Sequence, residues 1–87
     1  MPNYEHSKIY KIVNNDTDLV YYGATTQELY TRYHDHKRKN KGYLTEIFKG
    51  NKPTIILVDF FSCGGIEEIK QKLHYYIQNN NCVNKLV

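Results

Sequence analysis

Three segments in the front third of the chain decide the fold: Lys8-Ile9-Tyr10, Val20-Tyr21-Tyr22-Gly23-Ala24-Thr25-Thr26 and Leu29-Tyr30-Thr31-Arg32-Tyr33-His34-Asp35-His36. Residues 9–13 and 19–22 are rich in β-forming side chains, and the turn-forming residues 14–18 separate them. This pattern predicts a β-hairpin. Tyr10 and Tyr21 are therefore expected to lie near each other on paired strands.

A helix is expected after this hairpin, over about residues 26–39. Thr25 and Glu28 fit a capping box, in which each side chain would accept a backbone N–H of the other residue. Arg32 and His36 lie one turn apart on this helix, so they share a face with each other and converge with the two phenols. Such a set suits a phosphate, because a guanidinium offers a planar fork of donors and phenols or an imidazole can move protons.

The ordered segments resemble those of the GIY-YIG nuclease family. Lys8-Ile9-Tyr10 stands where the family has its first triplet, and Tyr21-Tyr22-Gly23 stands where it has the second. The likeness covers roughly residues 8–85 and also includes Ala24-Thr25-Thr26, Leu29, Arg32, His36 and Cys82-Val83-Asn84-Lys85. It implies an α+β fold with a small three-stranded antiparallel sheet flanked by helices. The activity that it implies is metal-dependent hydrolysis of DNA phosphodiesters.

The resemblance also implies a role for each matching residue. Tyr10 would help to activate a water molecule, and Tyr21 and His36 would position water or relay protons. Arg32 would hold the phosphate, and Asn84 would brace the active site. The cofactor implied for an active member is a divalent metal, Mg²⁺ or Mn²⁺.

One departure from the family lies in the C-terminal third of the chain. The family's metal-binding Glu precedes by four residues an Ile that resembles Ile77, which places Leu73 at the metal position. Leucine binds no metal, so no metal ligand is identified and a weak or inactive nuclease is expected. Glu67 and Glu68 point roughly 120° and 140° away from Leu73 on an ideal helix. Leu73 is then a natural departure or an engineered replacement, unless the alignment is wrong by a turn and one of these glutamates holds the metal.

Basic residues cluster just beyond the predicted site. We interpret four of them as nucleic-acid-binding residues: Lys37, Arg38, Lys39 and Lys41. The net charge of +3 and the pI of about 8.8 permit such a partner without demanding it. The alternative is a solvated helix end, where cations suit the helix dipole. The expected partner is DNA, with duplex, branched and single-stranded forms left open.

The remaining sequence predicts supporting structure. Residues 43–48 are expected to form a short helix, and the nearly continuous apolar run of residues 54–61 a central or fully covered third strand. A long helix is expected over residues 66–78, with an apolar stripe that comprises Ile66, Ile69, Leu73, Tyr76 and Ile77.

Length and composition favour one small intracellular domain. The 87 residues suffice for a single core, assigned to residues 8–87 after a flexible tail of residues 1–7. No apolar run approaches the ~20 residues that cross a bilayer, and the polar N-terminus lacks a signal-peptide core. A soluble cytoplasmic or nuclear protein without a membrane partner is expected, with Cys63 and Cys82 as reduced thiols.

Two further functions remain open at this stage. A non-catalytic nucleic-acid-binding module would use the same basic face and would tolerate Leu73. A protein-interaction domain on the same fold would bind neither DNA nor RNA at physiological salt.

Overall fold

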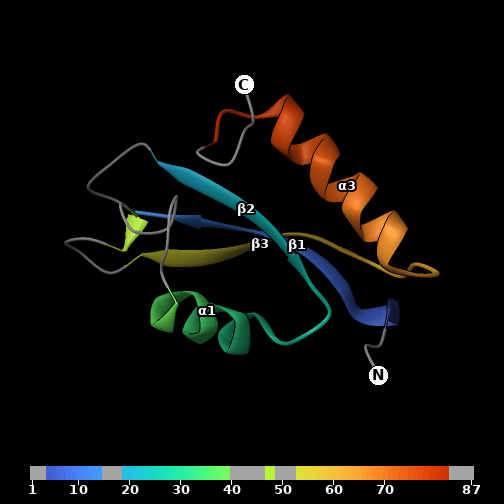
Figure 1. Cartoon of the computed structure of the whole chain (residues 1–87), viewed down its shortest axis with the longest axis horizontal. Coiled ribbons are helices and arrows are strands. Elements are labelled where there is room, and N and C mark those ends of the chain that lie inside the picture. Colours follow the sequence, from blue (N-terminus) through green and yellow to red (C-terminus); the bar gives the residue numbers. More distant parts are fainter. Residues whose placement is uncertain (1–3, 15–18, 40–46, 49–52, 83–87) are drawn as a thin grey trace.

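A computed structural model describes residues 4–14, 19–39, 47–48 and 53–82 (Figure 1). The elements in chain order are η1 (Tyr4–His6), β1 (Ser7–Val13), β2 (Val20–Thr25), α1 (Leu29–Arg38), β3 (Thr54–Phe61) and α3 (Ile66–Asn79). The three strands form one antiparallel sheet. The predicted α+β class with a three-stranded antiparallel sheet is therefore confirmed.

Strand β1 lies at the centre of the sheet, which has the order β2-β1-β3. Tyr10 pairs with Gly23 of β2, and Ile12 pairs with Tyr21 of β2 and with Ile55 of β3. The predicted hairpin is thus present. Because side chains alternate across a strand, Tyr10 and Tyr21 are diagonal neighbours on the same face of the sheet.

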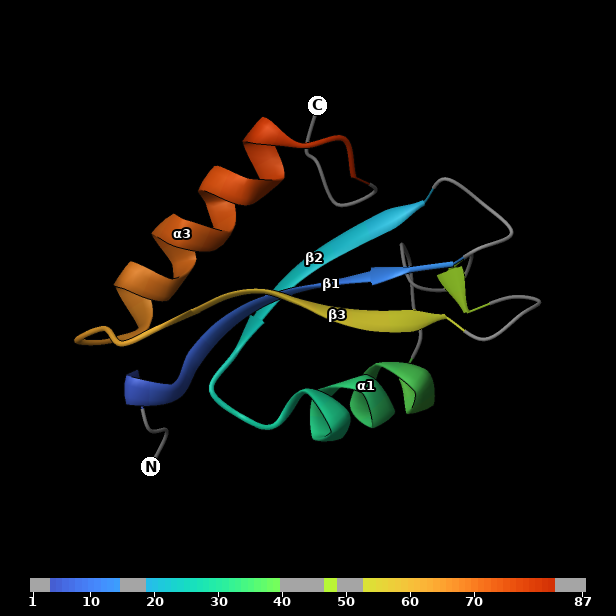
Figure 2. The ribbon, with the colours of Figure 1, turned by 180° about the vertical axis from the view of Figure 1, so that it is seen from behind.

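The two described α-helices lie on opposite sides of the sheet (Figures 1 and 2). The ring of Tyr21 meets His36 of α1, whereas the ring of the next residue, Tyr22, stacks on Tyr76 of α3. The face under α1 carries the buried cluster of Tyr10, Ile12 and Ile47, with Leu19, Tyr21, Leu29, Phe48 and Ile55 packed around it. The predicted site residues of β1 and β2 therefore form part of the hydrophobic core.

Strand β3 spans residues 54–61 as predicted, but its predicted central or fully covered position is wrong. It is an edge strand, and Ile56, Leu57 and Phe60 are 39%, 47% and 56% exposed. The apolar run indicates that these residues form a strand. It does not indicate where the strand lies in the sheet, because the order of the strands depends on contacts between distant segments.

The prediction of a flexible tail over residues 1–7 is wrong for residues 4–7. Tyr4–His6 form a turn of 3₁₀-helix, and Ser7 is buried as the first residue of β1. The Tyr4 carbonyl accepts hydrogen bonds from Ser7 Oγ at 2.8 Å and from the Cys63 backbone N–H at 3.0 Å. These bonds join the N-terminal segment to the segment that follows β3.

The first helix begins three residues later than predicted, at Leu29. The backbone N–H of Gln27 donates to Thr25 Oγ1 at 2.9 Å, so the threonine side chain stabilises a local turn instead of a helix start. Glu28 occupies the N-cap position and makes no side-chain cap bond, so the predicted capping box is wrong. The loop between β2 and α1 is consequently longer than expected.

The C-terminal helix matches its prediction closely, since α3 covers residues 66–79. Ile69 is buried, but Ile66 of the predicted apolar stripe is about half exposed. The predicted short helix at residues 43–48 falls largely outside the described residues. Cys63 and Cys82 are present as thiols. Within the described parts of the chain, no helix has the length and apolar character needed to span a membrane.

Candidate functional site

The centre of the site is a buried hydrogen bond between Tyr10 of β1 and His36 of α1. Tyr10 Oη lies 2.6 Å from His36 Nε2. The ring of Tyr21 packs edge-on against His36, with 5.3 Å between ring centroids. The β1–β2 hairpin and helix α1 thus bring together three residues that the sequence predicts for the site: Tyr10, Tyr21 and His36.

Gly23 makes room for Tyr10 at this centre. A Cβ atom at position 23 would lie 2.3 Å from both Cζ and Oη of Tyr10, well inside van der Waals contact. The phenol ring therefore lies directly over the glycine of the paired strand. The glycine of the second triplet has a steric role that only the pairing of Tyr10 with Gly23 reveals.

Burial holds the tyrosine and the histidine in their neutral forms. It raises the pKa of Tyr10 to about 12, together with the neighbouring Tyr21, while the hydrogen bond and charge of Arg32 oppose this rise. Burial also lowers the pKa of His36 to about 4, with a further contribution from the Arg32 charge and an opposing one from Asp35. At neutral pH a protonated phenol therefore faces an uncharged imidazole that can accept its hydrogen bond.

The free energy of unfolding is expected to fall as the pH drops from 6.5, the ordinary pKa of His36, to about 4, its value in the folded protein. In this window the unfolded chain binds a proton that the folded protein excludes, so acid favours unfolding. The contribution of His36 is on the order of 2 to 3 kcal/mol, measurable by urea denaturation at both ends of the window.

A His36→Gln variant is expected to lose most of this pH dependence. The matched control is His34→Gln, because His34 lies on the same helix and is exposed. An unchanged pH profile in His36→Gln would show that the imidazole titrates normally in the folded protein.

Arg32 connects this buried centre to the surface. Its side chain is 37% exposed, and Nη1 lies 3.6 Å from Asp35 Oδ2. The same guanidinium is close enough to Tyr10 to counteract the rise in its pKa. Arg32 is thus a cation that is available to solvent while it acts on the buried phenol.

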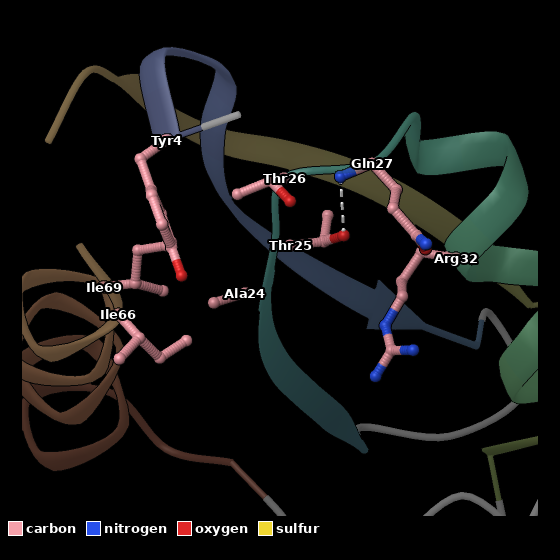
Figure 3. A pocket seen from close by; sticks show the side chains of 8 residues that line it. All are labelled: Tyr4, Ala24, Thr25, Thr26, Gln27, Arg32, Ile66 and Ile69. Atoms are coloured by element: carbon pink, nitrogen blue, oxygen red, sulfur yellow. Dashed lines mark hydrogen bonds between the residues drawn. The ribbon is translucent and has the colours of Figure 1, made fainter. Parts of the chain in front are cut away.

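Arg32 also lines a pocket of about 250 Å³ at the end of β2 (Figure 3). The lining residues come from η1, β2, the loop after it, and both helices: Tyr4, Ala24, Thr25, Thr26, Gln27, Arg32, Ile66 and Ile69. The pocket therefore forms where α1 and α3, which cover opposite faces, both approach the end of β2.

The side of α3 that faces this pocket is apolar. Ile66 and Ile69 line it, and Leu73 lies about 40° around the helix from Ile69. Glu67 and Glu68 are exposed and are not among the described lining residues, and Glu68 Oε1 accepts the Gly64 N–H at 3.3 Å. An alignment with the family that is shifted by one turn thus gains no support, because neither glutamate is among the described residues that line the pocket with Arg32.

No carboxylate is among the described residues that line the pocket. Mg²⁺ and Mn²⁺ prefer carboxylate and other oxygen ligands, whereas α3 presents only isoleucines to the pocket. In residues 4–14, 19–39, 47–48 and 53–82, no group of three or more His, Cys, Asp or Glu could hold a metal ion.

The basic cluster lies at the C-terminal end of α1. Lys37 and Lys39 are exposed. Arg38 is also exposed, and its Nη2 lies 2.8 Å from Asp35 Oδ1 in an ion pair. Asp35 therefore offsets part of the charge of both Arg32 and Arg38. Two other predicted site residues, Lys41 and Asn84, lie outside the described residues.

Lys8 contributes to the structure of the site, and the sequence does not predict this role. Its Nζ donates to the carbonyl oxygens of His6 and Gln27, each at 3.0 Å. These bonds tie the loop between β2 and α1 to the start of β1, and thereby fix one rim of the pocket. No sequence signal points to this role, since both acceptors are backbone atoms.

Comparisons with protein-family models, with curated proteins and with solved structures find no match for this chain.

Proposed function

We propose that this chain is a GIY-YIG-like domain that binds DNA through Tyr10, Arg32 and His36, and that it cleaves DNA weakly or not at all. The observation that supports this best is the meeting of Tyr10, Tyr21 and His36 beside the accessible guanidinium of Arg32. A DNA partner would place the protein inside the cell, in the cytoplasm or the nucleus.

In this proposal Arg32 binds the phosphate. Its fork of donors matches two phosphate oxygens, and its ion pair with Asp35, at 3.6 Å, is long enough to be exchanged for a stronger one. The exposed Lys37 and Lys39 would contact neighbouring phosphates and add a salt-dependent contribution. The buried Tyr10–His36 pair would hold the phosphate-binding face in shape.

The same residues explain why cleavage would be weak. With a pKa of about 12, Tyr10 keeps its proton at neutral pH and is a poor general base. His36 is uncharged and cannot stabilise a developing negative charge as an imidazolium. In the family a divalent metal stabilises charge on the leaving oxygen, and a chain that lacks its ligand is expected to react slower by orders of magnitude.

Removing Arg32 is expected to weaken DNA binding in metal-free buffer. Arg32→Ala should cost roughly 10- to 100-fold in affinity, the range for losing a charged hydrogen-bonding partner. Arg38→Ala, the matched control, should cost much less because Arg38 is exposed and pairs closely with Asp35. Fluorescence anisotropy with labelled DNA at several salt concentrations measures both effects, and equal losses in the two variants would contradict the proposal.

A protein-interaction role is the second candidate function. The observation that favours it is the edge strand β3, which exposes Ile56, Leu57 and Phe60. Exposed apolar residues on an edge strand are typical of surfaces that pair with another chain. DNA binding that is absent at physiological salt would favour this alternative.

A further inference from the structure

The pocket at the end of β2 divides into an apolar part and a cationic part. In Figure 3, Tyr4, Ile66 and Ile69 gather on one side, Arg32 lies on the opposite side, and Ala24 and Thr25 lie between them. Of the eight described lining residues, Arg32 alone is charged. A ligand that fills this pocket would therefore combine a flat or apolar group with an anionic group.

The size of the pocket suits a planar ring. A cavity of roughly 150 Å³ accepts benzene, and this pocket measures about 250 Å³. Ile66 remains 49% exposed at its edge, so a bound ring would remove apolar surface from water. Tyr4 adds an aromatic ring on which a base can stack.

Hydrogen bonds fix the main chain that carries the Tyr4 ring. The Tyr4 carbonyl accepts hydrogen bonds from Ser7 Oγ and from the Cys63 N–H. On the opposite rim, Lys8 fixes the carbonyl of Gln27 at 3.0 Å. Hydrogen bonds to the carbonyls of Tyr4 and Gln27 therefore fix the main chain on both sides of the pocket and leave the side chains of these two residues unused.

We infer that this pocket receives one unpaired nucleotide of DNA, with its base against the side formed by Tyr4 and the α3 isoleucines and its phosphate on Arg32. The inference rests on the proposed function, since it assigns Arg32 the same phosphate. A base inside a duplex is stacked and paired and cannot enter such a pocket, so unpaired nucleotides are the expected substrate class. The domain should prefer flaps, branches or single strands to intact duplex.

The test compares three DNA probes in metal-free buffer: a blunt duplex, the same duplex with one unpaired flap nucleotide, and that flap made abasic. The protein should bind the flap more tightly than the abasic flap, on the order of tenfold, as expected for one stacked base. In Tyr4→Ala this preference should disappear, whereas Tyr4→Phe should retain it. Tyr75→Ala is the matched control, because Tyr75 is an exposed tyrosine on α3 and is not a described lining residue.

Folding of Tyr4→Ala is checked by its thermal melt, and its main-chain hydrogen bonds should survive the substitution. An equal preference for the flap base in the parent chain and in Tyr4→Ala would overturn the inference. If Arg32→Ala still weakened binding in that case, the proposed DNA-binding function would stand and only the nucleotide pocket would fail. Absence of binding to every probe would overturn both.

Discussion

Leu73→Glu is expected to cleave DNA in the presence of Mg²⁺ or Mn²⁺, at a rate orders of magnitude above that of the parent chain. The substitution supplies a carboxylate, the ligand type that these ions prefer, at the position where the family resemblance expects one. A bound divalent metal is worth several kcal/mol of transition-state stabilisation. Cleavage of duplex, single-stranded and branched DNA is followed on denaturing gels.

Three variants make this result interpretable. Leu73→Gln should remain inactive because it has a similar shape to Glu without the charge, and Leu73→Glu combined with Arg32→Ala should lose the gain. Ile66→Glu tests a position about two turns earlier on α3, since Ile66 lines the pocket with Arg32 and is exposed enough to tolerate a charge. Activity in Ile66→Glu alone would place the metal position about two turns from Leu73. Robust cleavage by the parent chain would refute the proposal that it is impaired.

Gly23→Ala is expected to lower the free energy of unfolding by about 1 to 3 kcal/mol, the usual cost of overpacking a core. The added methyl group would lie 2.3 Å from the ring of Tyr10, and the ring is buried and cannot move without disturbing His36. Such a loss is a large share of a stability of ~5–15 kcal/mol. Urea denaturation measures the change, and the DNA affinity of the folded fraction should fall as Tyr10 shifts.

Gly65→Ala is the matched control for this substitution. A Cβ atom at Gly65 would meet nothing within 4 Å, and its φ of 173° is open to any residue. Its stability should therefore stay near that of the parent chain. A Gly23→Ala protein as stable as Gly65→Ala would mean that the Tyr10 ring does not lie over Gly23 in solution.

Local patterns predicted most of the elements. The turn residues between two β-rich segments predicted the hairpin, and the apolar run at residues 54–61 matched the bounds of β3. The steps of three and four between Leu29, Arg32 and His36 placed the arginine and the histidine on one face of α1. Each of these signals depends on residues that are close in the sequence, so neighbouring side chains suffice to specify them.

The sequence predicts several of the residues that meet at the candidate site but not their chemistry. Sequence reasoning identifies Tyr10, Tyr21, Arg32 and His36 as site residues. It missed Tyr4, which was assigned to a flexible tail, because the hydrogen bonds of Tyr4 and Ser7 involve the distant Cys63. It also missed that burial keeps Tyr10 and His36 neutral, since burial depends on how the helix packs on the sheet.

The sequence by itself determined which segments become strands and helices, and which polar side chains share a face, because propensity and periodicity are local properties. Only the tertiary structure decided that β3 lies at an edge, that α1 and α3 cover opposite faces, and that apolar residues of α3 meet Arg32 across a pocket. These outcomes depend on pairing and burial between segments far apart in the chain, where many arrangements of the same elements satisfy the local preferences.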